Sequence, residues 1–460
     1  MKRLVINNGY VIDPANKISS LLNIAIEGGK IVEISNDILH GEELIDAEGL
    51  IISPGFIDCH MHEDPYDPEL DKINISIFNC MLRMGVTTAV GGNCGSGPVD
   101  IPKYINAIDR AGLPVNFSML VPHNILRALE GINDKYGKAS PVEISNMKIR
   151  AQQYLDLGCL GISFGIRYVP GLDEKELKEI SSACKKDKKI IVAHIRDDAK
   201  NVIASAKELI EIGLNHNLPI QISHLGSMGA YGQMEELLSL IDYHKLNGLD
   251  ISADCYPYNA FSTSVGATTY DSGFLERYGA DYEAIEIAEG KYKGQRCTEE
   301  IFKELRDTNP AILTIGHFMR EEDVDKAISH PNVFIASDGV MHNYQGHPRA
   351  AGTFPRVISK YVKEKQLISL YDAIGKMTWL PAKKYGLAKG TLSIGSDGDI
   401  LIFDYNEIKD NSTFEEPALP PNGIKYVLVN GEISCKDNNI LSYTSGRFIR
   451  TSTESYTIQK

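Results

Sequence analysis

Several features that would direct a chain to a membrane, to nucleic acid or to an oxidising compartment are absent from these 460 residues. No apolar segment approaches the roughly 20 residues that cross a bilayer. No run of Lys and Arg resembles a nucleic-acid footprint, and 61 acidic against 47 basic residues give a net charge of -14. The eight cysteines lack CxxC spacing, and the N-terminus lacks an uninterrupted apolar stretch with a cleavage site. We therefore expect a cytoplasmic protein with reduced thiols and with neither a membrane nor a nucleic acid as partner.

What the sequence does contain is a regular alternation of short apolar runs with longer helical patterns. This alternation is typical of repeated βαβ units with a parallel sheet. The candidate strands are 57–62, 87–94, 115–121, 160–165, 190–194, 220–224, 250–255, 312–316 and 333–337. We set 312–316 aside because it ends a stretch that interrupts the alternation. An α/β barrel takes about 250 residues, so the sequence predicts an α/β fold with a (β/α)8 TIM-type barrel and one smaller domain.

The two ends of the chain have a different texture, with short strands separated by turns. Neither end has enough strands to be stable alone, because hairpin-sized units are marginal in water. We expect residues 1–53 and 390–460 to form one small β-sandwich domain, and residues 54–389 to form the barrel. Within the barrel, a stretch at about 262–310 is predicted to be an insertion after a strand, on the active-site side, where it could act as a lid.

The most informative motif follows the apolar run 50–52 and the pair Pro54-Gly55. In the segment 58–62, DCHMH, successive side chains of a strand alternate between its two faces, so His60 and His62 point the same way. Two imidazoles on one face of a strand end are able to hold a metal ion, although isolated histidines commonly have a structural role. The choice between these interpretations depends on the rest of the chain.

Further reactive side chains close other predicted strands. Cys94, His194, His224 and Asp338 each stand at the carboxyl end of an apolar run. In a parallel barrel these ends meet at one mouth, where the catalytic residues of this architecture lie. With the histidine pair, the sequence therefore brings five metal-capable side chains and one carboxylate to a single opening.

The spread of these ligands along the chain favours a catalytic site over a structural one. A structural zinc site takes ligands close together in sequence and fills all four positions with Cys and His. A Cys94 thiolate is a soft ligand, so zinc is the metal that we expect. Two other interpretations are weaker: Cys94 as a small buried apolar residue, and the glycine-rich segment 91–97 as a phosphate loop, since it has neither GxGxxG nor GxxxxGK[ST] spacing.

These residues resemble the amidohydrolase superfamily of metal hydrolases. The resemblance rests on the motif 54–62 (PGFIDCHMH), on single histidines at two later strands, on 337–339 (SDG) and on the flanking β segments. The motifs that resemble its D-aminoacylase (N-acyl-D-amino-acid deacylase) branch are 92–95 (GNCG), 163–171 (SFGIRYVPG), 254–258 (DCYPY) and 347–357 (HPRAAGTFPRV). The hydantoinase and dihydroorotase branches usually bridge two metals with a lysine on the fourth strand. The segment 160–165 has no lysine, and Cys94 resembles the substitute bridge.

The resemblance implies zinc-dependent hydrolysis of the amide bond of an N-acyl-D-amino acid, which yields a carboxylic acid and a D-amino acid. It implies a tight zinc site at Cys94, His194 and His224. It also implies a second, weaker zinc site at His60 and His62, which shares Cys94.

The resemblance further implies that Asp338 is the general base and that Arg349 anchors the α-carboxylate of the substrate. A tyrosine of the turn 256–258 would assist, and we prefer Tyr258. Without the family, Arg349 would be assigned to a surface ion pair. Tyr256 or Tyr258 could equally be core rings with a satisfied hydroxyl.

One departure from the branch concerns charge near the substrate. Its members often carry a lysine shortly after the histidine that corresponds to His224, and this chain has the segment 225–229 (LGSMG) there. Arg167 is a cation at the mouth where an apolar residue is expected. Either it replaces the missing charge or selects an acidic side chain, or it forms a salt bridge with Asp197 or Asp198.

Two other functions compete with deacylation of N-acyl-D-amino acids. The first is hydrolysis of another amide on the same barrel: a cyclic ureide, an isoaspartyl dipeptide or an N-acetyl amino sugar. The second is an inactive barrel used for assembly, which the retained ligand set disfavours. The expected partner is a small-molecule substrate, and the sequence leaves the oligomeric state open, a homo-oligomer included.

Overall fold

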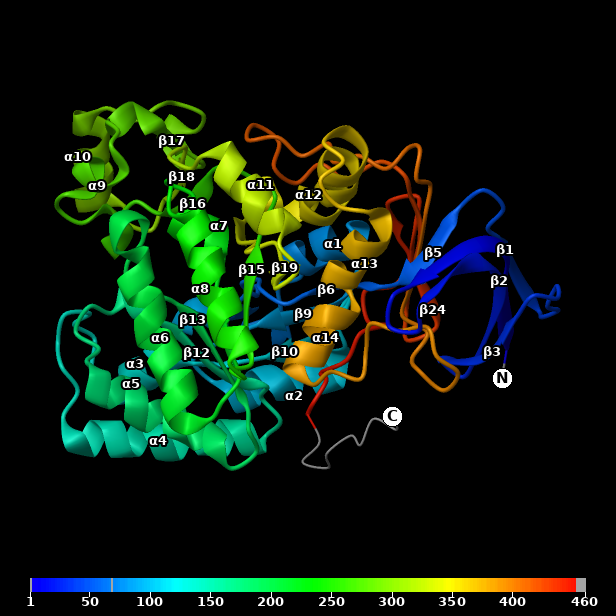
Figure 1. Ribbon diagram of the computed structural model, residues 1–460, viewed down its shortest axis with the longest axis horizontal. Coiled ribbons are helices and arrows are strands. Elements are labelled where there is room, and N and C mark those ends of the chain that lie inside the picture. Colours follow the sequence, from blue (N-terminus) through cyan, green and yellow to red (C-terminus); the bar gives the residue numbers. More distant parts are fainter. Residues whose placement is uncertain (1, 68, 452–460) are drawn as a thin grey trace.

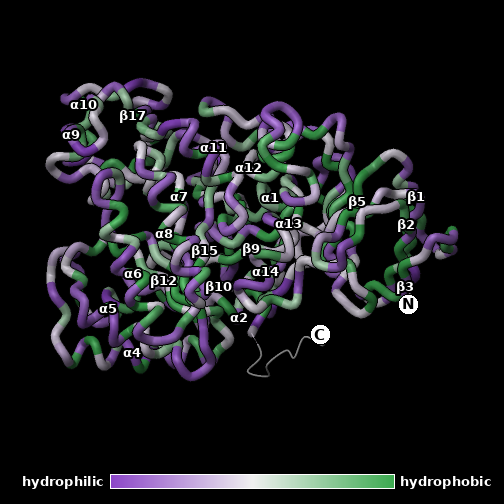
Figure 2. The backbone as a smooth tube through the Cα atoms, in the orientation of Figure 1, coloured by the Kyte–Doolittle hydropathy of each residue, from purple (hydrophilic) through white to green (hydrophobic). Residues whose placement is uncertain are grey.

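A computed structural model describes residues 2–67 and 69–451, so the last nine residues of the predicted terminal domain lie outside the described part. Parallel strands surrounded by helices form the larger part of the molecule, and a β-sheet built from both ends of the chain lies beside them (Figure 1). Hydrophobic segments gather along the central strands, while stretches of the outer helices are more hydrophilic (Figure 2). Each helix in the described residues is too short or too polar to cross a bilayer.

The parallel strands lie in a three-stranded sheet, β10-β9-β6, and a six-stranded sheet, β11-β12-β13-β14-β15-β19. Strands such as β9 and β12 are buried at every residue, as expected for parallel strands that helices cover. The strand bounds are β6 Phe56–Asp58, β9 Val86–Gly91, β10 Asn116–Met119, β11 Val121–Pro122, β12 Gly161–Gly165, β13 Ile190–His194, β14 Ile220–Ile222, β15 Ile251–Cys255 and β19 Val333–Ile335.

Helices follow most of these strands and pack outside them (Figure 1). Their starts carry local signals: α4 begins with a capping box in which Ser140 and Glu143 satisfy each other's backbone N–H. The helix bounds are α1 Ser76–Arg83, α2 Ile101–Ala111, α3 His123–Leu129, α4 Pro141–Asp156, α5 Glu174–Ser181, α6 Val202–His216, α7 Leu225–Gly229, α8 Met234–Leu246, α11 Glu321–Ser329, α12 Arg349–Arg356, α13 Leu370–Met377 and α14 Trp379–Tyr385.

The two parallel sheets adjoin at both of their edges. β10 and β11 are separated by Leu120 alone, whose N–H donates to the carbonyl of Gly91 at 3.0 Å. At the other edges, Met61 beyond β6 pairs in parallel with Gly339 beyond β19. The N–H of Asp338 donates to the carbonyl of His60 at 2.7 Å. The chain segments that carry the predicted site residues therefore lie side by side.

The predicted insertion forms a substructure of its own between β15 and β19. Its strands β16, β17 and β18 form an antiparallel sheet, and α9 and α10 cover them (Figure 1). The strand set aside in the sequence, 312–316, is β18 and pairs within this sheet rather than with the parallel strands. The bounds are β16 Phe261–Ser264, α9 Phe274–Tyr278, β17 Ile285–Ile287, α10 Glu299–Thr308 and β18 Leu313–Gly316.

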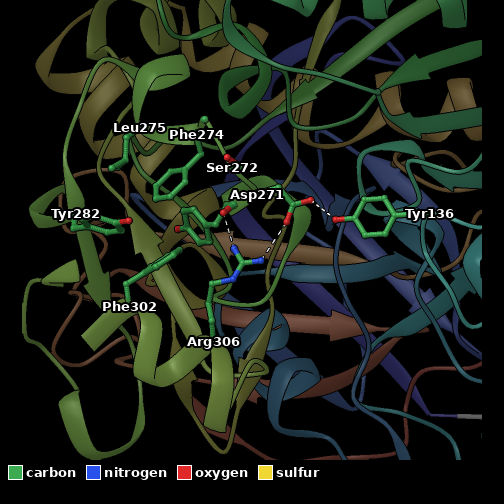
Figure 3. Close-up of a pocket in the computed structure, with 10 residues that line it drawn as sticks. Tyr136, Asp271, Ser272, Phe274, Leu275, Tyr282, Phe302 and Arg306 are labelled. Atoms are coloured by element: carbon green, nitrogen blue, oxygen red, sulfur yellow. Dashed lines mark hydrogen bonds and ion pairs between the residues drawn. The ribbon is translucent and has the colours of Figure 1, made fainter. Parts of the chain in front are cut away.

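A hollow of about 550 Å³ in the insertion lies where it meets the loop between α3 and α4 (Figure 3). Asp271 accepts a hydrogen bond from the hydroxyl of Tyr136 at 2.5 Å and from Arg306 Nη2 at 3.2 Å. The other side chains drawn around the hollow are mainly aromatic: Tyr270, Phe274, Tyr282 and Phe302. Asp271 therefore ties the insertion to the larger part of the fold at a point outside the predicted metal site.

The two ends of the chain meet in one nine-stranded sheet. The contact between them is the antiparallel pairing of β5 with β22, for example Ile52 with Ile402. The strand bounds are β1 Arg3–Asp13, β2 Ile18–Glu27, β3 Lys30–Ser35, β4 Glu43–Asp46, β5 Ile51–Pro54, β22 Ile400–Phe403, β23 Ile424–Val429, β24 Glu432–Lys436 and β25 Asn439–Ile440. The division into domains at 53/54 and 389/390 stays a prediction.

Ion pairs around Asp397 hold these ends together and predict a pH-dependent stability. The Asp397 carboxylate lies 2.8 Å from Lys389 Nζ, 2.7 Å from Lys30 Nζ and 3.0 Å from Arg447 Nη2. Burial raises the pKa of Asp397, but these cations hold it well below its ordinary value. A carboxyl group with a depressed pKa stabilises the folded state above its unfolded pKa of about 3.9, and this stabilisation is lost as the pH falls.

We expect Asp397→Asn to lower the free energy of unfolding at pH 7 by about 1–2 kcal/mol, because it leaves partly buried cations without their counter-charge. Urea unfolding at pH 7 and at low pH measures the effect, and the difference from the unmodified protein should shrink towards pH 2. The exposed Asp37 serves as the control in Asp37→Asn. An equal loss at both pH values would show that the charge of Asp397 is not responsible.

Candidate metal centre

The five predicted metal ligands converge at the carboxyl ends of the parallel strands. Two overlapping groups have ligand atoms within 4.8 Å of one another: His60, His62 and Cys94, and Cys94, His194 and His224. Cys94 belongs to both groups, so it stands where a ligand shared by two ions would be. The predicted convergence is therefore present in the geometry of the described residues.

The distances around Cys94 fit a pair of zinc ligands in each of the two groups. Its Sγ lies 3.3 Å from His60 Nε2 and 3.4 Å from His224 Nε2. Two ligands of a tetrahedral zinc ion, with bonds of about 2.3 Å to sulfur and about 2.0 Å to nitrogen, lie about 3.5 Å apart. The ring centroids of His194 and His224 are 4.4 Å apart, and His194 Nδ1 is buried without a hydrogen-bond partner among the described residues. One thiol and four imidazoles form a donor set that suits zinc.

The backbone is unusual at three of the converging residues. Cys94, His224 and Asp338 have positive φ angles of 52°, 34° and 48°. Such conformations of non-glycine residues cost about 1–3 kcal/mol each and cluster at functional sites. Gly92 and Gly95 flank Cys94 with φ of 72° and 71°, which glycine adopts without this cost. The fold thus tolerates local backbone strain at the residues that follow the parallel strands, where the candidate ligands converge.

Cys94 differs electrostatically from other cysteines of the chain. Burial raises its pKa, but the nearby His60 and His224 rings hold the pKa well below that of an ordinary thiol. Burial instead raises the pKa of Cys159 and of Cys255 to about 12. Cys94 is therefore poised as a thiolate, the form that binds metals, and the alternative of a small apolar core residue is disfavoured.

Asp338 lies beside the ligands without belonging to either group. Its Oδ1 is 3.2 Å from His62 Nε2, and its Oδ2 is 2.9 Å from Arg349 Nη1. Burial raises the pKa of Asp338, but Arg349 and His224 hold it well below the ordinary value. Burial lowers the pKa of His62, whereas Asp338 and Cys94 raise it to about 9. The carboxylate is thus charged and available to accept a proton at neutral pH.

Asp254 is a functional residue whose role the sequence did not reveal. Its Oδ1 accepts from His60 Nδ1 at 3.1 Å and from the N–H of His224 at 2.8 Å, and its Oδ2 accepts from Gln221 Nε2 at 2.7 Å. Such a carboxylate fixes the orientation of a metal-binding imidazole. The sequence feature that could have revealed this role is the position of Asp254 near the carboxyl end of β15. That strand pairs with β14, which His224 follows. On the other side, Ser227 Oγ lies 2.8 Å from His224 Nδ1.

Arg349 is buried at the first position of α12 and reaches the centre directly. Besides its contact with Asp338, its guanidinium lies 4.6 Å from the ring centroid of Tyr256. The hydroxyl of Tyr258 instead lies 3.5 Å from the carbonyl of Pro348. The tyrosine in contact with Arg349 is therefore Tyr256, while Tyr258 touches the segment that leads into Arg349.

Arg167 is placed at the mouth, where its charge is already paired. Its Nη1 donates to Asp197 Oδ1 at 2.8 Å, which is the salt bridge of the second interpretation. The hydroxyl of Thr268, from the insertion, donates to the carbonyl of Arg167 at 2.7 Å. Arg167 therefore also contacts the insertion.

A small cavity of about 30 Å³ lies between the centre and the insertion. That volume is about the share of one water molecule in the liquid. The residues that line it on the centre's side are Tyr168, His194, His224 and Asp338. Those that line it elsewhere are Asp198, Ser227, Met228, Phe261, Ser262, Thr263, Thr269 and Tyr278. The insertion thus roofs the metal centre.

Known proteins resemble this chain over nearly its whole length. A sequence model described as "Amidohydrolase family" matches residues 302–435. A D-aminoacylase from Alcaligenes xylosoxydans xylosoxydans is 30% identical, and the alignment covers 97% of each chain. The chain belongs to the amidohydrolase family. Within this family it stands in the D-aminoacylase branch, so the resemblance of its motifs is confirmed.

Solved structures of this amidohydrolase branch share the fold. An N-acyl-D-glutamate deacylase from Bordetella bronchiseptica, in complex with zinc and a phosphonate inhibitor that mimics the tetrahedral intermediate, superposes with a TM-score of 0.87. It is 27% identical, over 98% of this chain and 99% of that one. A D-aminoacylase structure concerned with a binuclear metal centre has a TM-score of 0.86 and 27% identity, over 98% and 100% of the two chains.

Proposed function

We propose that this protein is a zinc-dependent hydrolase of N-acyl-D-amino acids, which cleaves the amide bond to a carboxylic acid and a D-amino acid. The observation that carries the proposal is the position of Cys94 between His60 and His224, with Asp338 beside them. The similarity to a D-aminoacylase along 97% of the chain supports the same activity. A small-molecule substrate and a cytoplasmic location belong to this proposal.

We infer that the parallel strands form a closed (β/α)8 barrel. The nine strands of the two sheets count as eight, because β10 and β11 continue one another across Leu120. The pairing of Met61 with Gly339 supports closure between β6 and β19. The terminal β-sandwich domain, 1–53 with 390–460, and the lid role of 262–310 are part of the same proposal.

The proposed tight zinc site comprises Cys94, His194 and His224, and a weaker second site comprises His60 and His62 with the shared Cys94. Support comes from the two overlapping ligand groups. When bound, zinc lowers the pKa of a water molecule from 15.7 to about 7 and polarises an amide carbonyl. Asp254 orients His60 for this task, since it accepts a hydrogen bond from the ring nitrogen that faces away from Cys94.

Asp338 is the proposed general base. Its carboxylate accepts the proton of the attacking water and then delivers that proton to the leaving nitrogen, so it serves first as a base and then as an acid. The low pKa that Arg349 and His224 impose keeps the carboxyl group deprotonated at neutral pH, the form that a base requires. Its contact with His62 holds Oδ1 beside the ligand set.

Arg349 is the proposed anchor for the α-carboxylate. A guanidinium binds a carboxylate through two parallel hydrogen bonds and so orients the amide. Tyr258 is a positioning residue in this proposal, because its hydroxyl lies at the carbonyl of Pro348, which precedes Arg349.

We expect Arg349→Lys to raise KM for an N-acetyl-D-amino acid about 10–100-fold, because lysine cannot make the bidentate contact. Steady-state kinetics of the Arg349→Lys variant and of the unmodified protein measure the change in KM. Arg356→Lys, on the same helix, is the matched control, since Arg356 pairs with Asp410 rather than with Asp338. A KM that is unchanged in Arg349→Lys contradicts the assignment of the anchor.

Hydrolysis of a different amide is the second candidate function, since the metal centre itself does not specify the substrate. One experiment tests both candidate functions: zinc content and activity are measured on the same preparation. The substrates are N-acetyl-D-amino acids, their L forms, hydantoin, an isoaspartyl dipeptide and an N-acetyl amino sugar. We expect activity on the D forms. A zinc-loaded protein active only on another substrate contradicts the proposal, and one inactive on all of them supports an assembly role.

A further inference from the structure

The wall of the cavity across from the metal centre carries a buried carboxylate. Asp198 follows β13, four residues after the ligand His194, and only 3% of its surface is exposed. Its Oδ2 accepts a hydrogen bond from the hydroxyl of Tyr278 at 2.6 Å. Both Asp198 and Tyr278 line the cavity that the insertion covers.

This carboxylate keeps acceptor capacity for a further donor, because its two oxygens offer about four acceptor sites. Asp198 Oδ1 lies 2.8 Å from Arg277 Nε, yet neither atom has an aligned hydrogen-bond partner among the described residues. The two groups form an ion pair in which each neutralises the charge of the other.

Among the described residues, no lysine or arginine lines the cavity itself. Arg167 and Arg277 are turned to aspartates of one loop, Asp197 and Asp198. Arg349 contacts Asp338 and Ser262 at the cavity wall, but it is the proposed anchor for the α-carboxylate. An acidic substrate side chain in this cavity would therefore meet a carboxylate rather than a cation. A carboxylate that stays without a counter-charge in a buried site is strongly disfavoured.

This inference rests on the proposed function. We propose that Asp198, which the hydroxyl of Tyr278 positions, determines the specificity for the amino-acid side chain: the enzyme accepts D-amino acids whose side chain ends in a hydrogen-bond donor and rejects those that end in a carboxylate. Asp198 lies on a loop that directly continues a central strand, so it is a rigid reference point. Phe261, Thr269 and Tyr278 line the other side of the cavity, and because the cavity is small they would have to shift outward to admit a substrate side chain.

The amide pairs of the amino acids provide a sharp test, because D-Gln and D-Glu, like D-Asn and D-Asp, differ by one NH₂ group in place of an oxygen. A site built to bond a donor discriminates strongly against an analogue that lacks it. We expect kcat/KM of the zinc-loaded protein to favour N-acetyl-D-Gln over N-acetyl-D-Glu, or N-acetyl-D-Asn over N-acetyl-D-Asp, by at least about 10-fold.

Asp198→Asn should lower this ratio at least about 10-fold, since the asparagine amide offers a donor to a carboxylate as well as an acceptor. Tyr278→Phe should keep the preference for the amide, because the Asp198 carboxylate remains. Glu208→Gln is the matched control: Glu208 pairs with Arg196 of the same loop and lies outside the cavity. Thermal denaturation of each variant establishes that it is folded.

The outcomes distinguish a failure of the proposed side-chain specificity from a failure of the proposed deacylase activity. A protein that hydrolyses N-acetyl-D-amino acids but prefers Glu and Asp overturns the specificity alone, and it would return Arg167 to the role of selecting an acidic side chain. An amide preference that survives in a folded Asp198→Asn variant also overturns it. Inactivity towards every N-acetyl-D-amino acid contradicts the proposed function and the specificity together. The ratio in the unmodified protein decides the matter if Asp198→Asn does not fold.

Discussion

Asp338→Asn is expected to retain zinc and to lose about 10²- to 10⁴-fold in kcat, the range that general acid–base catalysis supplies. The amide has nearly the shape of the carboxylate, but it cannot accept the proton of the attacking water. The Asp338 carboxylate lies 3.2 Å from His62 Nε2 and 3.4 Å from His60 Nε2, and it lies outside both ligand groups, so the ligand set survives the substitution.

Metal analysis and steady-state kinetics on the same preparation measure this effect. Asp242→Asn is the matched control, because Asp242 also pairs with a histidine, His330 at 3.1 Å, and both residues lie outside the ligand groups and the cavity. That variant should keep both zinc and kcat. A zinc-loaded Asp338→Asn protein within 10-fold of the unmodified rate would exclude Asp338 as the base. A loss of zinc in this variant would instead assign it to the ligands.

Cys94→Ala is expected to remove bound zinc and, with it, activity to below detection. The thiolate is shared by both ligand groups, so its removal weakens both sites at once. Loss of a residue that merely supports a ligand already costs about 10–100-fold in metal affinity, and loss of the ligand itself costs more. The methyl group of alanine keeps the buried volume nearly filled, so the fold is retained.

Zinc content after dialysis, with thermal denaturation as the measure of folding, tests this expectation. Cys59→Ala is the control: Cys59 is equally buried and lies close by in the sequence motif, but it belongs to neither ligand group. Burial raises the pKa of its thiol well above the ordinary value, unlike that of Cys94. If Cys94→Ala bound zinc as tightly as Cys59→Ala does, the proposed centre would be wrong.

The strand positions and the convergence of the candidate ligands were predictable because both follow from local pattern. Parallel strands between helices are buried on both faces, so they stand out as short apolar runs between helical segments. The last residue of each run, such as His194 at the end of β13, necessarily stands at the carboxyl edge. Convergence of His60, Cys94 and His224 therefore required no knowledge of side-chain contacts.

Other features depend on packing between segments that are distant in sequence. Nothing local indicates that Asp254 accepts from His60 or that Tyr256 rather than Tyr258 meets Arg349. For Arg167 the sequence left two roles open, and the structure shows the salt bridge with Asp197. Loops after the strands follow no fixed periodicity, and rotamers are set by neighbours that come from other loops. Strand periodicity thus placed the residues at the carboxyl ends of the parallel strands. Their partners, their charge states and the position of the insertion above them came from long-range packing.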